Sequence, residues 1–233
     1  SETGRDDWPN HSFIGIDLGS CCDSFNDASI ISLDCTFGEM QPKPAWLDSD
    51  LVSRMNSNET WMQRKVGRWA AWRSMSSIME ILQSKINEIT DESALRRTKI
   101  ELEGRFGCVS DPRWPYRIEE KSLHCIIVSS SSGGTGSGII RDLGLSLGSA
   151  YPEATISLLL AIPGEDESGS LIQAVSNTES TISELSWWQV ELDQVQFPDC
   201  IKKSRVPLFN DIHVIHSREG MQADPEALAV GLA

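Results

Sequence analysis

The chain has 233 residues, of which 39% are hydrophobic and 23% are charged, a balance typical of a globular protein with a sizeable core rather than of a disordered one. The formal net charge of −14 argues against a surface that binds duplex nucleic acid, because phosphate binding needs a basic face. No run of residues approaches the length of a membrane span. The composition therefore predicts a globular protein with neither a nucleic-acid partner nor a membrane span.

The cysteines and histidines give little support for a metal site. None of the cysteines forms a C-x-x-C pair, so a zinc ribbon is disfavoured. Several lie in strand-like runs, where a reduced cysteine behaves as a small apolar residue, and this favours a cytoplasmic setting. In HVIH, His213 and His216 fall on opposite faces of an expected strand, which favours packing or surface roles over metal ligation. The six cysteines are Cys21, Cys22, Cys35, Cys108, Cys125 and Cys200.

The first half of the chain contains two expected strands and a long expected helix. Residues 13–18 (FIGIDL) and 29–35 (SIISLDC) are short apolar runs typical of buried strands. Residues 61–89 place their apolar side chains at helical intervals, which predicts an amphipathic helix whose Met and Trp side chains belong to the core. Residues 90–121 are charged and contain DPRWPYR, so a short helix followed by a loop is expected there.

The second half alternates strands and helices. The expected strands are residues 123–130, 154–163 and 211–217, and the expected helices are residues 139–150, residues 170–192 and a segment that starts at Asp224 and Pro225. Such alternation is typical of a parallel sheet covered by helices on both faces. The sequence therefore predicts one α/β domain over residues 1–233 whose parallel sheet includes all five strands.

The segment VSSSSGGTGSGII, residues 128–140, has the composition of a flexible linker, but its context favours a ligand-binding turn. An apolar strand runs directly into it and a helix follows directly, and parallel sheets bind ligands at the carboxyl ends of their strands. Glycines permit positive φ and a close backbone approach, so N–H groups here can surround an anion at the start of the helix. Thr135 and Ser137 can add hydroxyl donors. No Lys follows, so the segment is not the G-x-x-x-x-G-K-[ST] phosphate loop.

Residues 133–138, GGTGSG, resemble the glycine-rich signature loop of the tubulin/FtsZ superfamily. The flanking residues resemble tubulin without a gap: a helix, a Tyr-Pro turn at residues 151–152 and a strand that ends in Pro163. Upstream, SLDCTFGEM resembles the tubulin segment VDLEPGTM, and IGIDLGSCCDSF resembles the first nucleotide loop, HIQAGQCGNQI. FNDIHVIHS lies where the superfamily has the strand before its guanine-contacting loop. The resemblance implies a three-layer α/β nucleotide-binding domain, with a parallel sheet and helices on both faces.

The resemblance also implies a guanine-nucleotide site. Asp34 corresponds to the acidic residue near the magnesium ion, Ser217 stands where tubulins carry an Asn that reads guanine, and residues 165–167 fall in the loop that often touches the ribose. The phosphates would be held by Gly133, Gly134, Thr135, Gly136, Ser137 and Gly138, and the first loop would consist of Gly19, Ser20 and Cys21. The implied cofactors are GTP or GDP and Mg²⁺. The implied partners are further copies of the chain or other tubulin-like subunits, in a cytoskeletal, cytoplasmic setting.

The chain departs from the superfamily pattern at several of these positions. Ser132 replaces the first Gly of a fuller GGGTGSG, and Cys22 and Asp23 replace Gly-Asn in the first loop. Thr36 replaces an acidic residue that lies near the γ-phosphate in tubulins, and Ser217 replaces the base-reading Asn. The segment between the first two strands is too short for the family's first helix, and the groups that complete a neighbour's site come from beyond the last helix, which this sequence does not reach. These departures affect the expected hydrolysis more than the expected fold. The sequence also leaves open whether a further C-terminal domain exists.

Three functions remain open from the sequence. The first is a GTP-binding, tubulin-like protein that assembles head to tail. The second is a tubulin-like scaffold that has lost hydrolysis, which the altered first loop and Ser217 favour. The third is an ATPase of the actin/Hsp70 type, because IGIDLGS resembles the first phosphate loop of that family, although the downstream spacing does not fit.

Overall fold

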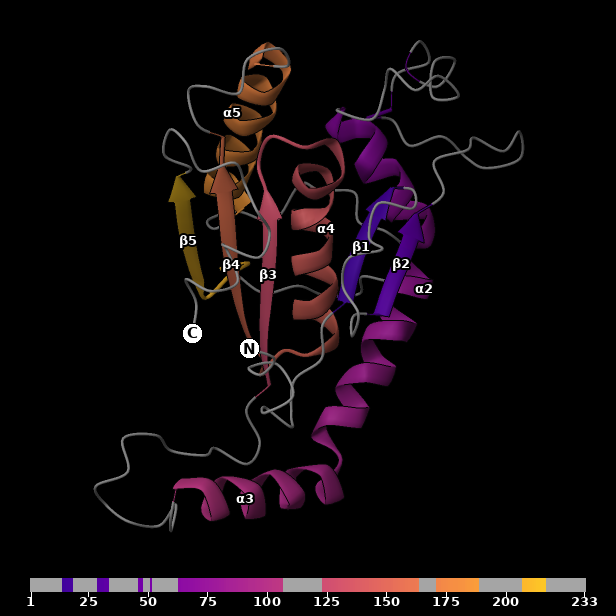
Figure 1. The fold of residues 1–233 in the computed structure, drawn as a ribbon. Helices are drawn as coiled ribbons and strands as arrows, with labels where there is room; N and C mark the ends of the chain where they lie inside the picture. Colours follow the sequence, from indigo (N-terminus) through magenta and orange to yellow (C-terminus); the bar gives the residue numbers. More distant parts are fainter. Residues whose placement is uncertain are drawn as a thin grey trace, which may run out of the picture.

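A computed structural model of the chain describes residues 14–18, 29–33, 46–47, 51, 63–106, 123–163, 171–188 and 207–216. The strands are β1 (Ile14–Leu18), β2 (Ser29–Leu33), β3 (His124–Ser130), β4 (Thr155–Ile162) and β5 (Asp211–His216). The helices are α2 (Arg64–Thr90), α3 (Glu92–Phe106), α4 (Gly134–Ala150) and α5 (Leu171–Trp188) (Figure 1). The expected alternation of strands and helices is present in this part of the chain. The helix expected from Asp224 lies outside the described residues.

The strands form two separate parallel sheets. β1 pairs with β2, whereas β3, β4 and β5 form a sheet in that order, in which Ile127 pairs with Leu158 and Leu158 with Ile212. The prediction of a single sheet with all five strands is therefore wrong for this structure. An apolar run specifies a buried strand but does not specify which edge it pairs with. Here α4 packs against both β1 and β3, and in Figure 1 it is seen between the two sheets.

The core lies around β4 and the crossing of α2 with α4. The residues of β4 from Ile156 to Leu160 are all buried, so this central strand is covered on both faces, whereas Ile126 and Val128 on the edge strand β3 are exposed. The largest fully buried side chains include Trp69, Met75 and Ile78 of α2, Ile140 and Leu145 of α4, and Leu208 and Phe209 before β5. The predicted α/β fold, a parallel sheet flanked by helices, is confirmed, and so is the predicted core role of the α2 Trp and Met side chains.

α4 starts earlier than the sequence predicts. It begins at Gly134 rather than at Ile139, because residues 131–133 are enough to turn the chain after β3. Most of GGTGSG is therefore the first part of a helix and not a loop. Within the residues that the structure describes, no helix is both long and apolar enough to cross a membrane.

Candidate functional site

The glycine-rich segment forms the turn between β3 and α4. β3 ends at Ser130, the chain bends over residues 131–133, and α4 begins at Gly134. The start of α4 thus lies at the carboxyl ends of β3 and β4, the end of a parallel sheet at which ligands bind. The interpretation of this segment as a flexible linker is excluded, because it joins two elements of one packed unit.

The glycines of this segment do not need positive φ, contrary to the prediction. Gly133 has φ −73° and ψ 159°, which most residues can adopt, and Gly134, Gly136 and Gly138 lie within α4. Gly136 and Gly138 are instead required for close packing. A Cβ atom added to Gly136 would lie 3.2 Å from the carbonyl oxygen of Ser130, so this glycine lets α4 start tightly against the end of β3.

The same glycines allow α2 to cross α4 at backbone contact. A Cβ atom on Gly67 would lie 2.6 Å from Cα of Thr135, and one on Gly138 would lie 2.8 Å from the backbone nitrogen of Arg68. Real Cβ atoms essentially never come within 3.0 Å of such atoms. Three small residues therefore meet where the two helices cross, Gly67 on α2 and Gly134 and Gly138 on α4, and α2 rests directly on the turn.

The N-terminus of α4 has the features of an anion site. Gly133 is its N-cap and supplies no side-chain cap, so the N–H groups of Gly134, Thr135 and Gly136 have neither an intrahelical acceptor nor a capping side chain. A Cβ atom on Gly133 would meet nothing within 4 Å, so there is open space beside the N-cap. The helix dipole adds a partial positive charge at this end. Backbone donors, charge and space thus coincide.

The two hydroxyl groups that the sequence analysis selected are placed differently. The Ser137 hydroxyl donates to the carbonyl oxygen of Gly133, one turn back in α4, and the side chain is buried. Thr135 is partly exposed at the start of the helix. Of the two hydroxyls, only that of Thr135 is not already engaged within the first turn of α4.

α5 and β4 hold the turn in place. Asn177 Nδ2 of α5 donates to the carbonyl oxygen of Ser132 at 2.7 Å. Ser131 Oγ lies 2.9 Å from Thr178 Oγ1, and the backbone N–H of Ser131 donates to the carbonyl oxygen of Ala161 at the end of β4. No motif in the sequence identified Asn177 and Thr178 as supports of the turn. The available signal was two adjacent polar residues within an expected helix. Buried polar side chains need hydrogen-bond partners, and here the turn supplies them.

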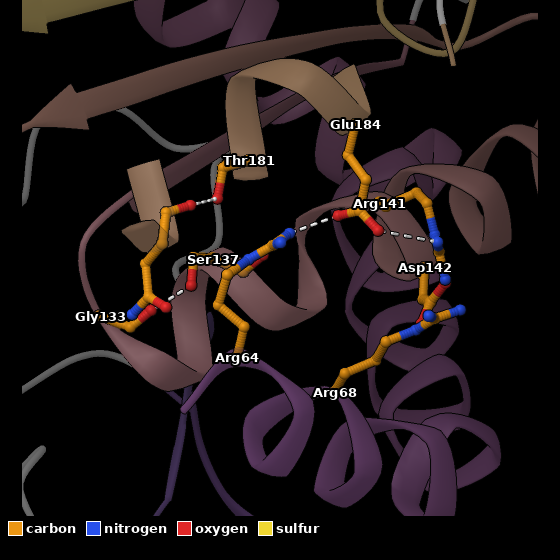
Figure 2. A network of polar contacts seen from close by, with 9 residues as sticks. Arg64, Arg68, Gly133, Ser137, Arg141, Asp142, Thr181 and Glu184 are labelled. Carbon is orange, nitrogen blue, oxygen red and sulfur yellow. Dashed lines mark hydrogen bonds and ion pairs between the residues drawn. The ribbon is translucent and has the colours of Figure 1, made fainter. Parts of the chain in front are cut away.

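A network of charged side chains lies behind the turn and joins three helices (Figure 2). Arg64 of α2 donates from Nη2 to the carbonyl oxygen of Ser137 at 3.1 Å and forms an ion pair with Glu184 of α5. Arg141 of α4 reaches the other carboxylate oxygen of Glu184 at 3.2 Å. Glu184 therefore links an arginine from α2 to one from α4.

Asp142 forms the buried half of this network. Its carboxylate is 2.9 Å from Nε of Arg68 and 2.6 Å from Nη2 of Arg141, and its side chain is 1% exposed. The Arg68 guanidinium also lies over the ring of Trp46, at 4.4 Å from the centroid. Burial raises the pKa of the Asp142 carboxyl above its ordinary value, and the neighbouring Arg141 opposes that shift because a guanidinium favours the carboxylate. No sequence motif marked this network.

The structure covers only part of the predicted site. Asp34, Thr36, Ser217 and residues 165–167 lie outside the described residues, as do Gly19, Ser20 and Cys21 of the first loop. His213 lies exposed on β5. Across the part of the chain that the structure describes, no group of three or more His, Cys, Asp or Glu side chains is placed to hold a metal ion. The segment predicted to bind phosphate, residues 133–138, is therefore the portion of the predicted site with known geometry.

Comparison with known families gives a match over most of the chain. A family model described as "Tubulin like" matches residues 40–224, a range that runs from before α2 to beyond β5 and contains the turn and α4. A search of curated proteins and a search of solved structures found no match. The family match covers well over half of the chain, and it agrees with the parallel α/β fold and with the GGTGSG segment at the start of α4. The chain belongs to the tubulin-like family.

Proposed function

We propose that this protein binds GTP or GDP with Mg²⁺ at the N-terminus of α4 and assembles with further tubulin-like subunits. The observation that carries the proposal is the uncapped start of α4 at the carboxyl end of β3, with open space beside Gly133. Phosphate groups favour such a helix terminus because several N–H groups and the helix dipole act on them together. Proteins of the tubulin-like family usually bind GTP.

The remaining parts of the proposed site follow from the superfamily resemblance. Gly19, Ser20 and Cys21 would approach the phosphates and the base, and Ser217 would face guanine. Asp34 would hold Mg²⁺, which would neutralise charge on the phosphates. Head-to-tail contacts that do not close would then give a linear assembly. We place this activity in the cytoplasm, as part of a cytoskeletal system.

The nucleotide site is tested by Gly133→Val. We expect the affinity for GTP to fall about tenfold or more, or about 1.4 kcal/mol, because the branched side chain fills the space in front of the N–H groups. The fold should be retained, with a cost of about 1 kcal/mol or less, because a Cβ atom at Gly133 meets no neighbour and the φ of −73° suits valine. Calorimetric titration with GTP measures the affinity, and thermal unfolding measures the fold.

Gly134 would be a poor choice for the same test. It is buried beneath Gly67, so its replacement would disturb the crossing of α2 with α4 as well as the anion site. An unchanged GTP affinity in Gly133→Val would show that the nucleotide does not bind at the start of α4.

Hydrolysis is expected to be slow. Thr36 cannot supply a carboxylate that orders magnesium and water, and Asp23 adds negative charge near the phosphates. We therefore expect turnover well below about one per second, the lower end of ordinary enzyme rates. Steady-state phosphate release measures this, with Asp34→Ala as the variant that should remove the magnesium-dependent part. Turnover at or above that rate would show that the chain has a complete catalytic site.

A scaffold without nucleotide is the second candidate function, favoured by the substitutions in the first loop and at Ser217. Denaturing the purified protein and separating the released nucleotide by chromatography distinguishes the candidates. Guanine nucleotide supports the proposal, whereas no nucleotide supports the scaffold. Adenine nucleotide would support an ATPase of the actin/Hsp70 type.

A further inference from the structure

α3 is a helical arm at the edge of the molecule. It follows α2 after a single residue, Asp91, and Figure 1 shows it projecting from the end of α2, away from both sheets. Arg96, Arg97 and Ile100 are exposed, and Ile100 remains 61% exposed although it is apolar. Ile100 lies four positions after Arg96 and three positions after Arg97, so it neighbours both arginines on the helix surface. We call them the α3 basic face.

The charge of this region is opposite to that of the rest of the chain. Residues 64–106, which form α2 and α3, contain nine Lys or Arg and six Asp or Glu, a net charge of about +3. The remaining residues contain 11 basic and 28 acidic side chains, a net charge of about −17. No ion pair in the described part of the chain engages Arg96 or Arg97. The exposed Arg96 and Arg97 at the end of this region fit an acidic surface.

α5 offers such a surface together with apolar contact area. Ile172, Val175, Glu179 and Ile182 follow helical spacing along one side of α5, and all four are exposed, Ile172 to 89%. The Glu179 carboxylate thus lies between apolar side chains. The α3 basic face has the matching arrangement, with guanidinium groups beside the apolar Ile100. We call these four residues the α5 stripe. The rest of α5 carries Glu184 and no basic residue.

We propose that the α3 basic face of one copy binds the α5 stripe of a second copy. Arg96 and Arg97 would pair with Glu179, and Ile100 would pack against Val175 and Ile182. Within one copy the two surfaces cannot meet, because α3 and α5 lie at opposite ends of the molecule (Figure 1). The contact is therefore between two different surfaces, and such a contact continues into a chain of subunits unless it closes into a ring.

This contact rests on the proposed assembly of subunits and names the surfaces that would form it, and it involves no residue of the proposed nucleotide site. It predicts self-association without nucleotide, at low ionic strength. Its charged part should weaken with salt, since a Debye length of about 14 Å at about 0.05 M salt shrinks to about 4 Å at about 0.5 M. Sedimentation velocity of the purified chain over a range of protein concentrations measures both effects.

Charge exchange tests the pairing directly. Arg96→Glu with Arg97→Glu should weaken self-association about tenfold or more, because like charges then face each other, and Glu179→Arg should do the same. An equimolar mixture of the two variants should recover association, since each then finds an oppositely charged face on the other. Arg96→Gln with Arg97→Gln is a milder test that avoids new like-charge pairs within α3. Glu80→Arg, on an exposed part of α2, is the matched control and should associate as wild type does.

The outcomes are distinct. Loss of association in each variant and its recovery in the mixture support the contact. The contact would be overturned if the charge-reversed and the Gln variants associate as the wild type does. It would also be overturned if the wild-type chain stays monomeric at low salt, or if α3 binds nucleic acid instead. The Gly133→Val variant separates this inference from the nucleotide proposal, since it should lose GTP affinity and keep the α3–α5 contact.

Discussion

Replacing Asp142 by alanine is expected to lower the free energy of unfolding by about 3–5 kcal/mol, the usual cost of removing one partner from a buried ion pair. The side chains of Asp142, Arg141 and Arg68 are 1%, 8% and 15% exposed, so solvent compensates little for the missing carboxylate. Arg68 would keep its contact with Trp46 but would lose its anionic partner. Denaturant unfolding followed by circular dichroism measures the change.

The control for Asp142→Ala is Glu88→Ala, which removes a carboxylate from an exposed ion pair with Lys85. Such surface pairs contribute about 0–1 kcal/mol, so this variant should unfold almost as the wild type does. If both variants shift the midpoint equally, the buried network does not stabilise the packing of α2 on α4.

Gly67→Ala is expected to destabilise the protein by about 3 kcal/mol, the upper part of the usual range for overpacking. The added methyl group would lie 2.6 Å from Cα of Thr135, and the atoms that must move belong to the backbone of α4 rather than to a flexible side chain. Outside this contact, alanine would favour a helix over glycine by about 1 kcal/mol, so steric conflict opposes an intrinsic gain.

Two other glycines serve as controls for Gly67→Ala. Gly133 and Gly104 have nothing within 4 Å of an added Cβ atom. Gly104→Ala, in α3, should stabilise the helix by about 0.5–1 kcal/mol, and Gly133→Ala should cost about 1 kcal/mol or less. A Gly67→Ala variant as stable as the wild type would mean that α2 does not rest on the turn.

The sequence predicted the helices and strands better than it predicted which of them pack or pair with each other. The helical spacing of Trp69 and Met75 and the apolar run of β4 depend on local periodicity, which a sequence shows directly. Strand pairing depends on which edges meet in three dimensions, so the separation of β1 and β2 from the other strands had no local signal. The start of α4 was misplaced because glycine is a poor helix former, whereas here Gly136 and Gly138 are needed for packing.

The candidate site was found by its glycines but not by its supports. Composition identified GGTGSG, while the reason for its glycines required the crossing with Gly67, a residue 66 positions before Gly133. The supports come from two other helices, α2 and α5. Arg64 donates to Ser137 in α4, Glu184 pairs with Arg64, and Asn177 donates to Ser132 in the turn. Contacts over such separations in sequence leave no pattern in a single chain. They became visible only once α2 and α5 were placed.

Gly67 lies in the first turn of α2, so a small tilt of this helix about its crossing with α4 moves its far end much more than its near end. The first turn of α2 rests on the backbone at the start of α4, where we propose that an anion binds, and the other end of α2 leads into α3. The 23 steps from Gly67 to Thr90 span about 35 Å at 1.5 Å per residue. A tilt of about 5° about the crossing would therefore carry the start of α3 by about 3 Å. A shift at the turn too small to disturb the core is thus magnified at the far tip, where a pair of spectroscopic labels on α3 and β4 can register it.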